Sequence, residues 1–231
     1  MSGLLISFDG TDSSGKETQS RLLTKRLLSH GRHVYRFATP DYQTRSGRVL
    51  KKRLQNKIGD WASTPWLEKL KYFSANRAEH REEVINALNK GDIIIYDRYV
   101  PSSLAFIVIE ALSEDPDLER PDIYQAVRKT EYEDNGMPLE NISIFLDVPP
   151  QISTTLLEKR KEKLNDKDEY TDHIKVQQRL YNEYDLLCQS NPGHYLRIKC
   201  AIGNSLLGIN DTAELIWTGL LEKFPALADN N

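Results

Sequence analysis

Seven residues near the amino terminus constrain the fold more than any other feature: Gly10-Thr11-Asp12-Ser13-Ser14-Gly15-Lys16. They follow an apolar run at 4–8 and open an amphipathic segment at 16–29, so they lie between an expected strand and an expected helix. Glycines let the backbone N–H groups of such a loop curl around a phosphate, and the helix amino terminus adds a positive field. The pattern predicts a phosphate-binding loop, 10–18, whose Lys16 reaches the β and γ oxygens of a nucleotide.

The residue after this lysine departs from the usual pattern. A serine or threonine normally supplies a hydroxyl to Mg²⁺ there, but this chain has Glu17, and the threonine follows as Thr18. We therefore expect a bound Mg²⁺ to depend on water and phosphate oxygens more than on a loop hydroxyl. The residues expected to hold the nucleotide are Gly10, Asp12, Ser13, Ser14, Gly15, Lys16, Glu17 and Thr18.

The rest of the chain alternates short apolar runs with longer amphipathic segments. Further strands are expected at 33–38, 93–96, 142–148 and 195–199, and helices at 64–90, 150–163, 173–189 and 211–223. This alternation predicts an α/β fold with an open, mostly parallel five-stranded sheet that helices cover on both faces. Because no repeat or Gly/Ser-rich linker interrupts the pattern, we expect one domain over 1–231.

Charge and cysteine content narrow the ligand class and the compartment. With 34 acidic and 31 basic residues the net charge is −3. Neither nucleic acid nor an anionic membrane is expected as a partner, since proteins that bind either of them usually carry an excess of basic residues. Cys188 and Cys200 cannot form a disulfide framework or a zinc site. As the chain also shows no signal peptide and no apolar run of about 18 residues, we expect a cytoplasmic protein.

One motif matches a pattern of a different class of protein, the GTPases. Asn89-Lys90-Gly91-Asp92 matches the N-K-x-D pattern with which GTPases read guanine. In those proteins the pattern lies at the carboxyl end of a strand, where ligands bind. Here it precedes the expected strand at 93–96, so we interpret it as the end of a helix.

Asp97-Arg98-Tyr99 does lie at the carboxyl end of that strand. We expect Asp97 near the metal or the reacting phosphoryl group and Arg98 on an acceptor phosphate, although a surface ion pair would also fit the pattern. On the helix before it, Phe73 and Arg77 are four residues apart and project from one face. An aromatic plane beside a planar donor suits a base pocket, whereas the alternative is a core phenylalanine beside a surface arginine.

Together these motifs resemble the thymidylate kinase family over nearly the whole chain. The matching segments are Phe8-Asp9-Gly10-Thr11-Asp12, Gly15-Lys16-Glu17-Thr18-Gln19, Tyr72-Phe73-Ser74-Ala75-Asn76-Arg77 and Asp97-Arg98-Tyr99, followed by Ser102 and Ala105-Phe106. The resemblance implies transfer of the γ-phosphate of ATP to dTMP, giving dTDP for deoxythymidine nucleotide biosynthesis, with Mg²⁺ and in a homodimer. Another nucleoside or nucleotide kinase of this fold, or a non-catalytic nucleotide-binding protein, remains an alternative.

The resemblance also implies roles for single residues. Asp12 would lie near the sugar 3′-hydroxyl and the acceptor phosphate, and Phe73 would stack on thymine while Arg77 donates to its O4. Further substrate contacts would come from Tyr42, Ser102, Phe106 and Tyr170, the last against the deoxyribose. Asp97 and Arg98 would be the pair nearest the metal and the phosphate.

The chain departs from the family at two arginines. After the second strand it reads Ala38-Thr39-Pro40-Asp41-Tyr42-Gln43, so the usual phosphate-binding arginine is absent and Arg45 or Arg48 would replace it. Ser13 occupies the loop position where some relatives carry an arginine. We therefore expect a charged segment at about 156–172 to act as a lid that supplies Arg160 as a catalytic cation, although a solvated loop would have the same composition.

The sequence does not identify which residues would form a dimer interface. Apolar residues are frequent near 64–90 and 99–112. They would suit either the homodimer interface that the resemblance implies or a buried core.

Overall fold

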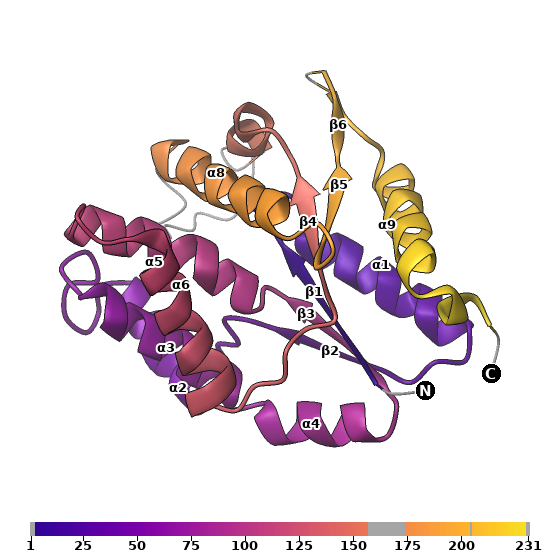
Figure 1. Cartoon of the computed structure of the whole chain (residues 1–231), viewed down its shortest axis with the longest axis horizontal. Coiled ribbons are helices and arrows are strands. Elements are labelled where there is room, and N and C mark those ends of the chain that lie inside the picture. The colour runs from indigo at the N-terminus through magenta and orange to yellow at the C-terminus, as the bar shows by residue number, and fades with distance from the viewer. Residues whose placement is uncertain (1–2, 157–173, 204, 230–231) are drawn as a thin grey trace.

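The computed structural model describes residues 3–156, 174–203 and 205–229. Its centre is a five-stranded sheet with the order β2-β3-β1-β4-β5, in which every neighbouring pair is parallel (Figure 1). The strands are β1 (Leu4–Asp9), β2 (Val34–Ala38), β3 (Ile93–Asp97), β4 (Ile142–Asp147) and β5 (Tyr195–Lys199). The predicted fold class, an open parallel sheet of the nucleotide kinase type, is confirmed.

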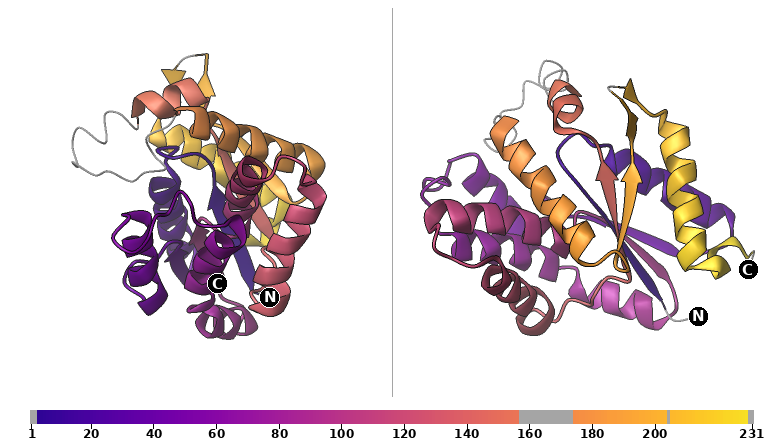
Figure 2. Two further views of the ribbon diagram at one scale, coloured as in Figure 1. Left: turned by 90° about the vertical axis from the view of Figure 1, so that its left-hand side faces the viewer. Right: turned by 45° about the horizontal axis from the view of Figure 1, so that its top comes forward.

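Helices connect the strands and cover both faces of this sheet. They are α1 (Lys16–Ser29), α2 (Arg45–Leu54), α3 (Trp66–Ala78), α4 (Arg81–Asn89), α5 (Val100–Glu114), α6 (Arg120–Arg128), η1 (Lys129–Asp134), α8 (Ile174–Ser190), α9 (Ile209–Lys223) and η3 (Pro225–Ala228), with a further helical stretch at 150–156. A short antiparallel hairpin, β6 (Ala201–Ile202) with β7 (Ser205–Leu206), follows β5. Figure 2 shows α1 and α9 on one side of the sheet and α3, α5 and α8 on the other.

The two cores follow from the alternation of side chains along a strand. Ile6 and Ile95 are paired neighbours on β1 and β3 and pack beneath α1 and α9. Leu5 and Ile94, one residue earlier on each strand, pack beneath α5 and α8. All four are completely buried. Because both faces need apolar residues, these strands read as continuous apolar runs rather than as alternating ones.

The prediction of one long helix over 64–90 is wrong. The structure ends α3 at Ala78 and begins α4 at Arg81. At the break, the Glu79 carboxylate accepts hydrogen bonds from the backbone N–H groups of Arg45 and Ser46 at the start of α2. Orphan N–H groups at a helix start need such acceptors, and this contact between distant segments is one that helical periodicity does not report.

The apolar residues of α5 belong to the core of the chain itself. Leu104, Ile107, Val108 and Ala111 are at most 2% exposed and pack in the cluster on the α5 side of the sheet. On α3, by contrast, Leu67 is 47% exposed. Of the two segments that suited a dimer face, 99–112 is thus accounted for mainly by burial within one chain. Nowhere in the described residues is there a helix long and apolar enough to span a membrane.

Candidate active site

The loop between β1 and α1 has the backbone shape of a phosphate cradle. Gly10, Ser13 and Gly15 have positive φ angles of 145°, 57° and 91°. At Gly10 a Cβ atom would lie 3.1 Å from both the Leu146 carbonyl oxygen and Ser14 Oγ, so a side chain there would be crowded as well as strained in conformation. At Gly15 space is open and only the conformation favours glycine. The loop therefore turns tightly into α1, which begins at Lys16.

Lys16 lies inside this loop rather than on the surface. It is 6% exposed, and its Nζ donates to the carbonyl oxygens of Gly10 and Thr11 at 3.1 and 2.6 Å. Burial, and secondarily the positive charge of Arg98, lower the pKa of Lys16 to about 7. A phosphate placed in the cradle would restore the charged form, because an anion favours a nearby ammonium group.

Asp97 and Arg98 end β3 beside this loop, because β3 is the direct neighbour of β1. Arg98 has a φ of 66°, unusual for a residue with a side chain, and its backbone N–H donates to the Phe8 carbonyl oxygen at 2.9 Å. Its guanidinium donates to the Gly10 carbonyl oxygen at 3.0 Å and pairs with Asp12. Arg98 thus points into the site, and the alternative of a surface ion pair does not fit.

The Asp97 carboxylate is the candidate metal ligand. Burial raises its pKa, and the charges of Lys16 and Arg98 oppose that rise. No hydrogen bond to this carboxylate is found within the described residues, where no group of three or more His, Cys, Asp or Glu side chains could hold a metal ion either. One carboxylate fits Mg²⁺, which commonly takes one or two protein carboxylates and completes its shell with phosphate oxygens and water.

Asp12 is held from two directions. One of its carboxylate oxygens pairs with Arg98, and the other accepts from Gln177 Nε2 at 2.8 Å. The Asp12 backbone N–H donates to Gln177 Oε1 at 2.9 Å, so the glutamine amide forms two hydrogen bonds with this loop residue. No sequence motif indicated Gln177. Its signal is a polar residue at a core position: it is 1% exposed on α8, three and seven residues before buried Leu180 and Tyr184.

A hollow of about 130 Å³ adjoins the loop. Seven of the predicted site residues line it, namely Asp12, Tyr42, Phe73, Arg77, Arg98, Ser102 and Phe106. Phe73 and Phe106 meet edge to face, with ring centroids 5.4 Å apart, which makes an aromatic wall. Such a wall beside charged groups can hold a flat ring at one end and an anion at the other.

Ser102 lines this hollow, but its hydroxyl is directed to a buried carboxylate. Ser102 Oγ donates to Asp9 Oδ1 at 2.6 Å and lies 3.0 Å from the Tyr184 hydroxyl. Asp9 is completely buried and also accepts hydrogen bonds from the hydroxyls of Ser7 and Ser143. This network joins β1, β4, α5 and α8 behind the hollow. No sequence motif marks this network, because hydrogen-bonded partners within it lie up to 134 residues apart.

Arg77 lies in the floor of the hollow and is 1% exposed, which excludes the alternative of a surface arginine. Its guanidinium pairs with Glu131 on η1 and donates to the Tyr99 carbonyl oxygen and to Ser103 Oγ. Glu131 is a second residue that no sequence motif indicated. It is completely buried.

Several predicted residues do not join this cluster. Glu17 is exposed and pairs with Arg21 one turn along α1 at 2.7 Å, and Thr18 is exposed too. Arg45 and Arg48 are exposed and are not among the residues that line the hollow. Arg160, Tyr170 and all but the first residue of the lid at 156–172 lie outside the described residues.

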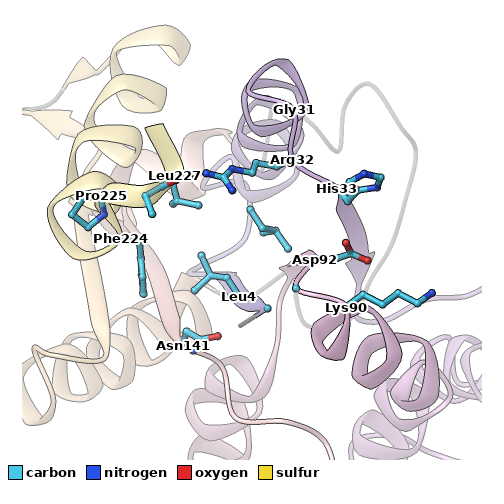
Figure 3. A pocket seen from close by; sticks show the side chains of 14 residues that line it. Leu4, Gly31, Arg32, His33, Lys90, Asp92, Asn141, Phe224, Pro225 and Leu227 are labelled. Carbon is cyan, nitrogen blue, oxygen red and sulfur yellow. Dashed lines mark hydrogen bonds between the residues drawn. The ribbon is translucent and has the colours of Figure 1, made fainter. Parts of the chain in front are cut away.

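A second hollow, of about 430 Å³, opens at the opposite end of the strands (Figure 3). The Arg32 guanidinium beside it donates to the carbonyl oxygens of Ala226 and Asp229, and the Asn141 side-chain oxygen accepts from Leu5 N–H. These groups tie the chain together. The Asn89–Asp92 segment also lies at this amino-terminal edge, as its position before β3 predicted, and ligands of parallel sheets bind at the other edge.

Comparisons with known proteins agree with this geometry. Residues 8–200 match the family model described as thymidylate kinase. The chain is 31% identical to a thymidylate kinase of Schizosaccharomyces pombe over 185 residues, 79% of each chain. It is 29% identical to one of Desulforudis audaxviator, covering 85% of this chain and 82% of the relative. A crystal structure of thymidylate kinase from Ehrlichia chaffeensis has the same fold, with a TM-score of 0.66, 21% identity and coverage of 95% and 100%.

Proposed function

The chain belongs to the thymidylate kinase family and phosphorylates dTMP in nucleotide biosynthesis, and on that premise we propose how its site works. The loop at 10–18 binds the phosphates of ATP, and the adjoining hollow binds dTMP. The observation that carries this assignment is the contact between Asp12 and Arg98, because it joins the phosphate loop to the hollow lined by Phe73 and Arg77. A phosphoryl donor and acceptor held on either side of that contact would meet at it.

The donor side works by charge neutralisation. Lys16 pairs with the β and γ oxygens of ATP, while N–H groups of the loop and of the α1 amino terminus bind the remaining oxygens. Mg²⁺, held through Asp97 and water, would neutralise charge on the transferring group. Phosphoryl transfer needs little covalent help from the protein, so positioning and charge supply most of the rate enhancement.

The acceptor side recognises the base and the phosphate of dTMP. Phe73 and Phe106 flank the pyrimidine, Arg77 donates to its O4, and Arg98 binds the acceptor phosphate while Asp12 lies near the sugar 3′-hydroxyl. Arg98 is the reason to prefer a nucleotide over a neutral nucleoside as acceptor. Arg160 is proposed to supply a catalytic cation from the lid, and Tyr170 to lie against the deoxyribose, as the sequence predicts. We also propose a cytoplasmic homodimer.

Base selection provides a direct check of the acceptor side. At position 4, dCMP presents an amino group to Arg77 where dTMP presents an oxygen, and two facing donors leave both unpaired. We expect kcat/KM for dCMP to be at least about 100-fold below that for dTMP, and that for dUMP, which lacks only a methyl group, about tenfold below. Steady-state kinetics with the three monophosphates at saturating ATP measures both ratios. Equal efficiency with dCMP and dTMP would rule out this pocket.

The lowered pKa of Lys16 predicts that ATP binding takes up a proton. At pH 8 most Lys16 is neutral without nucleotide, since its pKa is about 7, whereas phosphates stabilise the charged form. We expect uptake of about 0.9 proton per bound Mg·ATP at pH 8 and about 0.1 at pH 6. Calorimetric titrations in buffers of different ionisation enthalpy give this number. The same small uptake at both pH values would show that Lys16 is already charged before ATP binds.

A further inference from the structure

Glu131 lies directly behind the base pocket. It is on η1, a π-helix that continues α6, and its side chain is 0% exposed. One carboxylate oxygen accepts from the Arg77 guanidinium and, at 3.2 Å, from the Ser103 hydroxyl. Arg77 and Ser103 both line the hollow, whereas Glu131 does not. Any influence of Glu131 on a ligand must therefore pass through these two neighbours.

The first consequence of the contact between Arg77 and Glu131 is electrostatic. A guanidinium that is 1% exposed needs a counter-charge, because burial removes the water that would stabilise it. Burial acts to lower the pKa of Arg77, and the neighbouring Glu131 carboxylate outweighs it and raises that pKa. Arg77 and Glu131 together are neutral. The end of the hollow that Arg77 lines is thus suited to an uncharged polar ring rather than to a second phosphate.

The second consequence is orientation. Arg77 Nη1 donates to Glu131, and Nη2 donates to the Tyr99 carbonyl oxygen at 3.1 Å and to Ser103 Oγ at 3.2 Å. A guanidinium has five N–H groups in a rigid plane, so these three contacts fix where the other two point. Its Nε is buried and has no hydrogen-bond partner within the described residues. The guanidinium is thus fixed in place with donor capacity to spare.

We propose that Glu131 is a positioning residue for base recognition, which holds Arg77 so that the remaining N–H of its Nη1 meets the O4 oxygen of the pyrimidine. The proposal rests on the assignment of this hollow to dTMP. A fixed arginine also explains rejection of a 4-amino base, because it cannot turn away from a facing donor. Glu131 would thereby contribute to affinity and to base choice without touching the substrate.

The test compares Glu131→Gln with Glu133→Gln, an exposed neighbour on the same π-helix. Glutamine keeps the shape of Glu131 and removes the charge. We expect KM for dTMP to rise about tenfold, kcat to stay within about twofold, and the preference for dTMP over dCMP to fall about tenfold, since the hydrogen bond from Arg77 loses its charged acceptor and the guanidinium is held less firmly. Glu133→Gln should match wild type. A lower melting temperature with unchanged KM and base preference would overturn the proposal and leave Glu131 a purely structural residue.

A second pair of variants covers the case in which Glu131→Gln fails to fold. A double substitution, Arg77→Met with Glu131→Met, replaces the buried pair by apolar side chains, which folds tolerate better than half a pair. If Glu131 acts only through Arg77, this double variant and a second one, Arg77→Met with Glu131→Gln, in which no buried charge is left unpaired, will have the same KM for dTMP and the same base preference. A difference of about tenfold between the two double variants would overturn the proposal. Absence of dTMP phosphorylation by wild type would instead overturn the assignment of the site.

Discussion

Replacing Lys16 by alanine is expected to lower kcat for dTMP phosphorylation by about 100-fold or more, because it removes the cation of the phosphate loop that meets the β and γ oxygens. The folded chain should lose little stability, because the hydrogen bonds of Nζ to the Gly10 and Thr11 carbonyl oxygens disappear together with an unfavourable buried charge. Lys16 is 6% exposed and burial lowers its pKa, so its charge is a cost to the folded state in the absence of nucleotide. Rates at saturating substrates and thermal melting of the same preparation measure the two effects.

Lys25→Ala is the matched control for this variant. Lys25 is on the same helix, α1, and is exposed. Its removal should change neither kcat nor melting temperature. If folded Lys16→Ala retained a near-normal kcat, the loop at 10–18 would not be the phosphate site.

Asp97→Asn is expected to lower kcat by about 100-fold and to raise the Mg²⁺ concentration needed for half-maximal rate, because an amide is a far weaker magnesium ligand than a carboxylate. Burial raises the pKa of Asp97, which means that the folded state disfavours its charge. The amide should therefore not lower the melting temperature at neutral pH. A titration of the rate with Mg²⁺ for wild type and variant measures the shift.

Asp92→Asn is the matched control for this variant. Asp92 directly precedes β3 and Asp97 is its last residue, and both side chains are partly buried. Asp92→Asn lies at the edge of the sheet away from the phosphate loop and should behave as wild type. An Asp97→Asn variant with the wild-type rate and the wild-type Mg²⁺ dependence would remove Asp97 from the mechanism.

The strands and the loop could be predicted because their signals are local. A strand buried on both faces is an apolar run, and β3 and β4 appear as such in the sequence. The loop is marked by two glycines whose positive φ angles are a requirement of its turn. The loop and Asp97-Arg98 both follow strands of a parallel sheet, which predicts that they share its carboxyl edge, and the structure brings them together there.

The partners of the site residues could not be predicted, because they come from distant segments with no motif of their own. Gln177 contacts Asp12 across 165 residues, and Glu131 contacts Arg77 across 54. Each is a polar residue at a buried position on a helix, which a sequence shows only as a break in an apolar stripe. The end of α3 escaped notice for the same reason, since Glu79 there caps a helix that begins 34 residues earlier.

Transfer of label from γ-labelled ATP is the measurement that most directly tests whether the loop and the hollow form one active site. Purified chain, Mg²⁺ and labelled ATP are incubated separately with dTMP, dUMP, dCMP, dAMP, dGMP and thymidine, and the products are separated. We expect label in dTDP as the main product, little in dUDP and hardly any with the other acceptors. Label in dTMP from thymidine would make the chain a nucleoside kinase. Label found only in inorganic phosphate, or only in ATP, would show that the loop and the hollow do not form one site for phosphoryl transfer to dTMP.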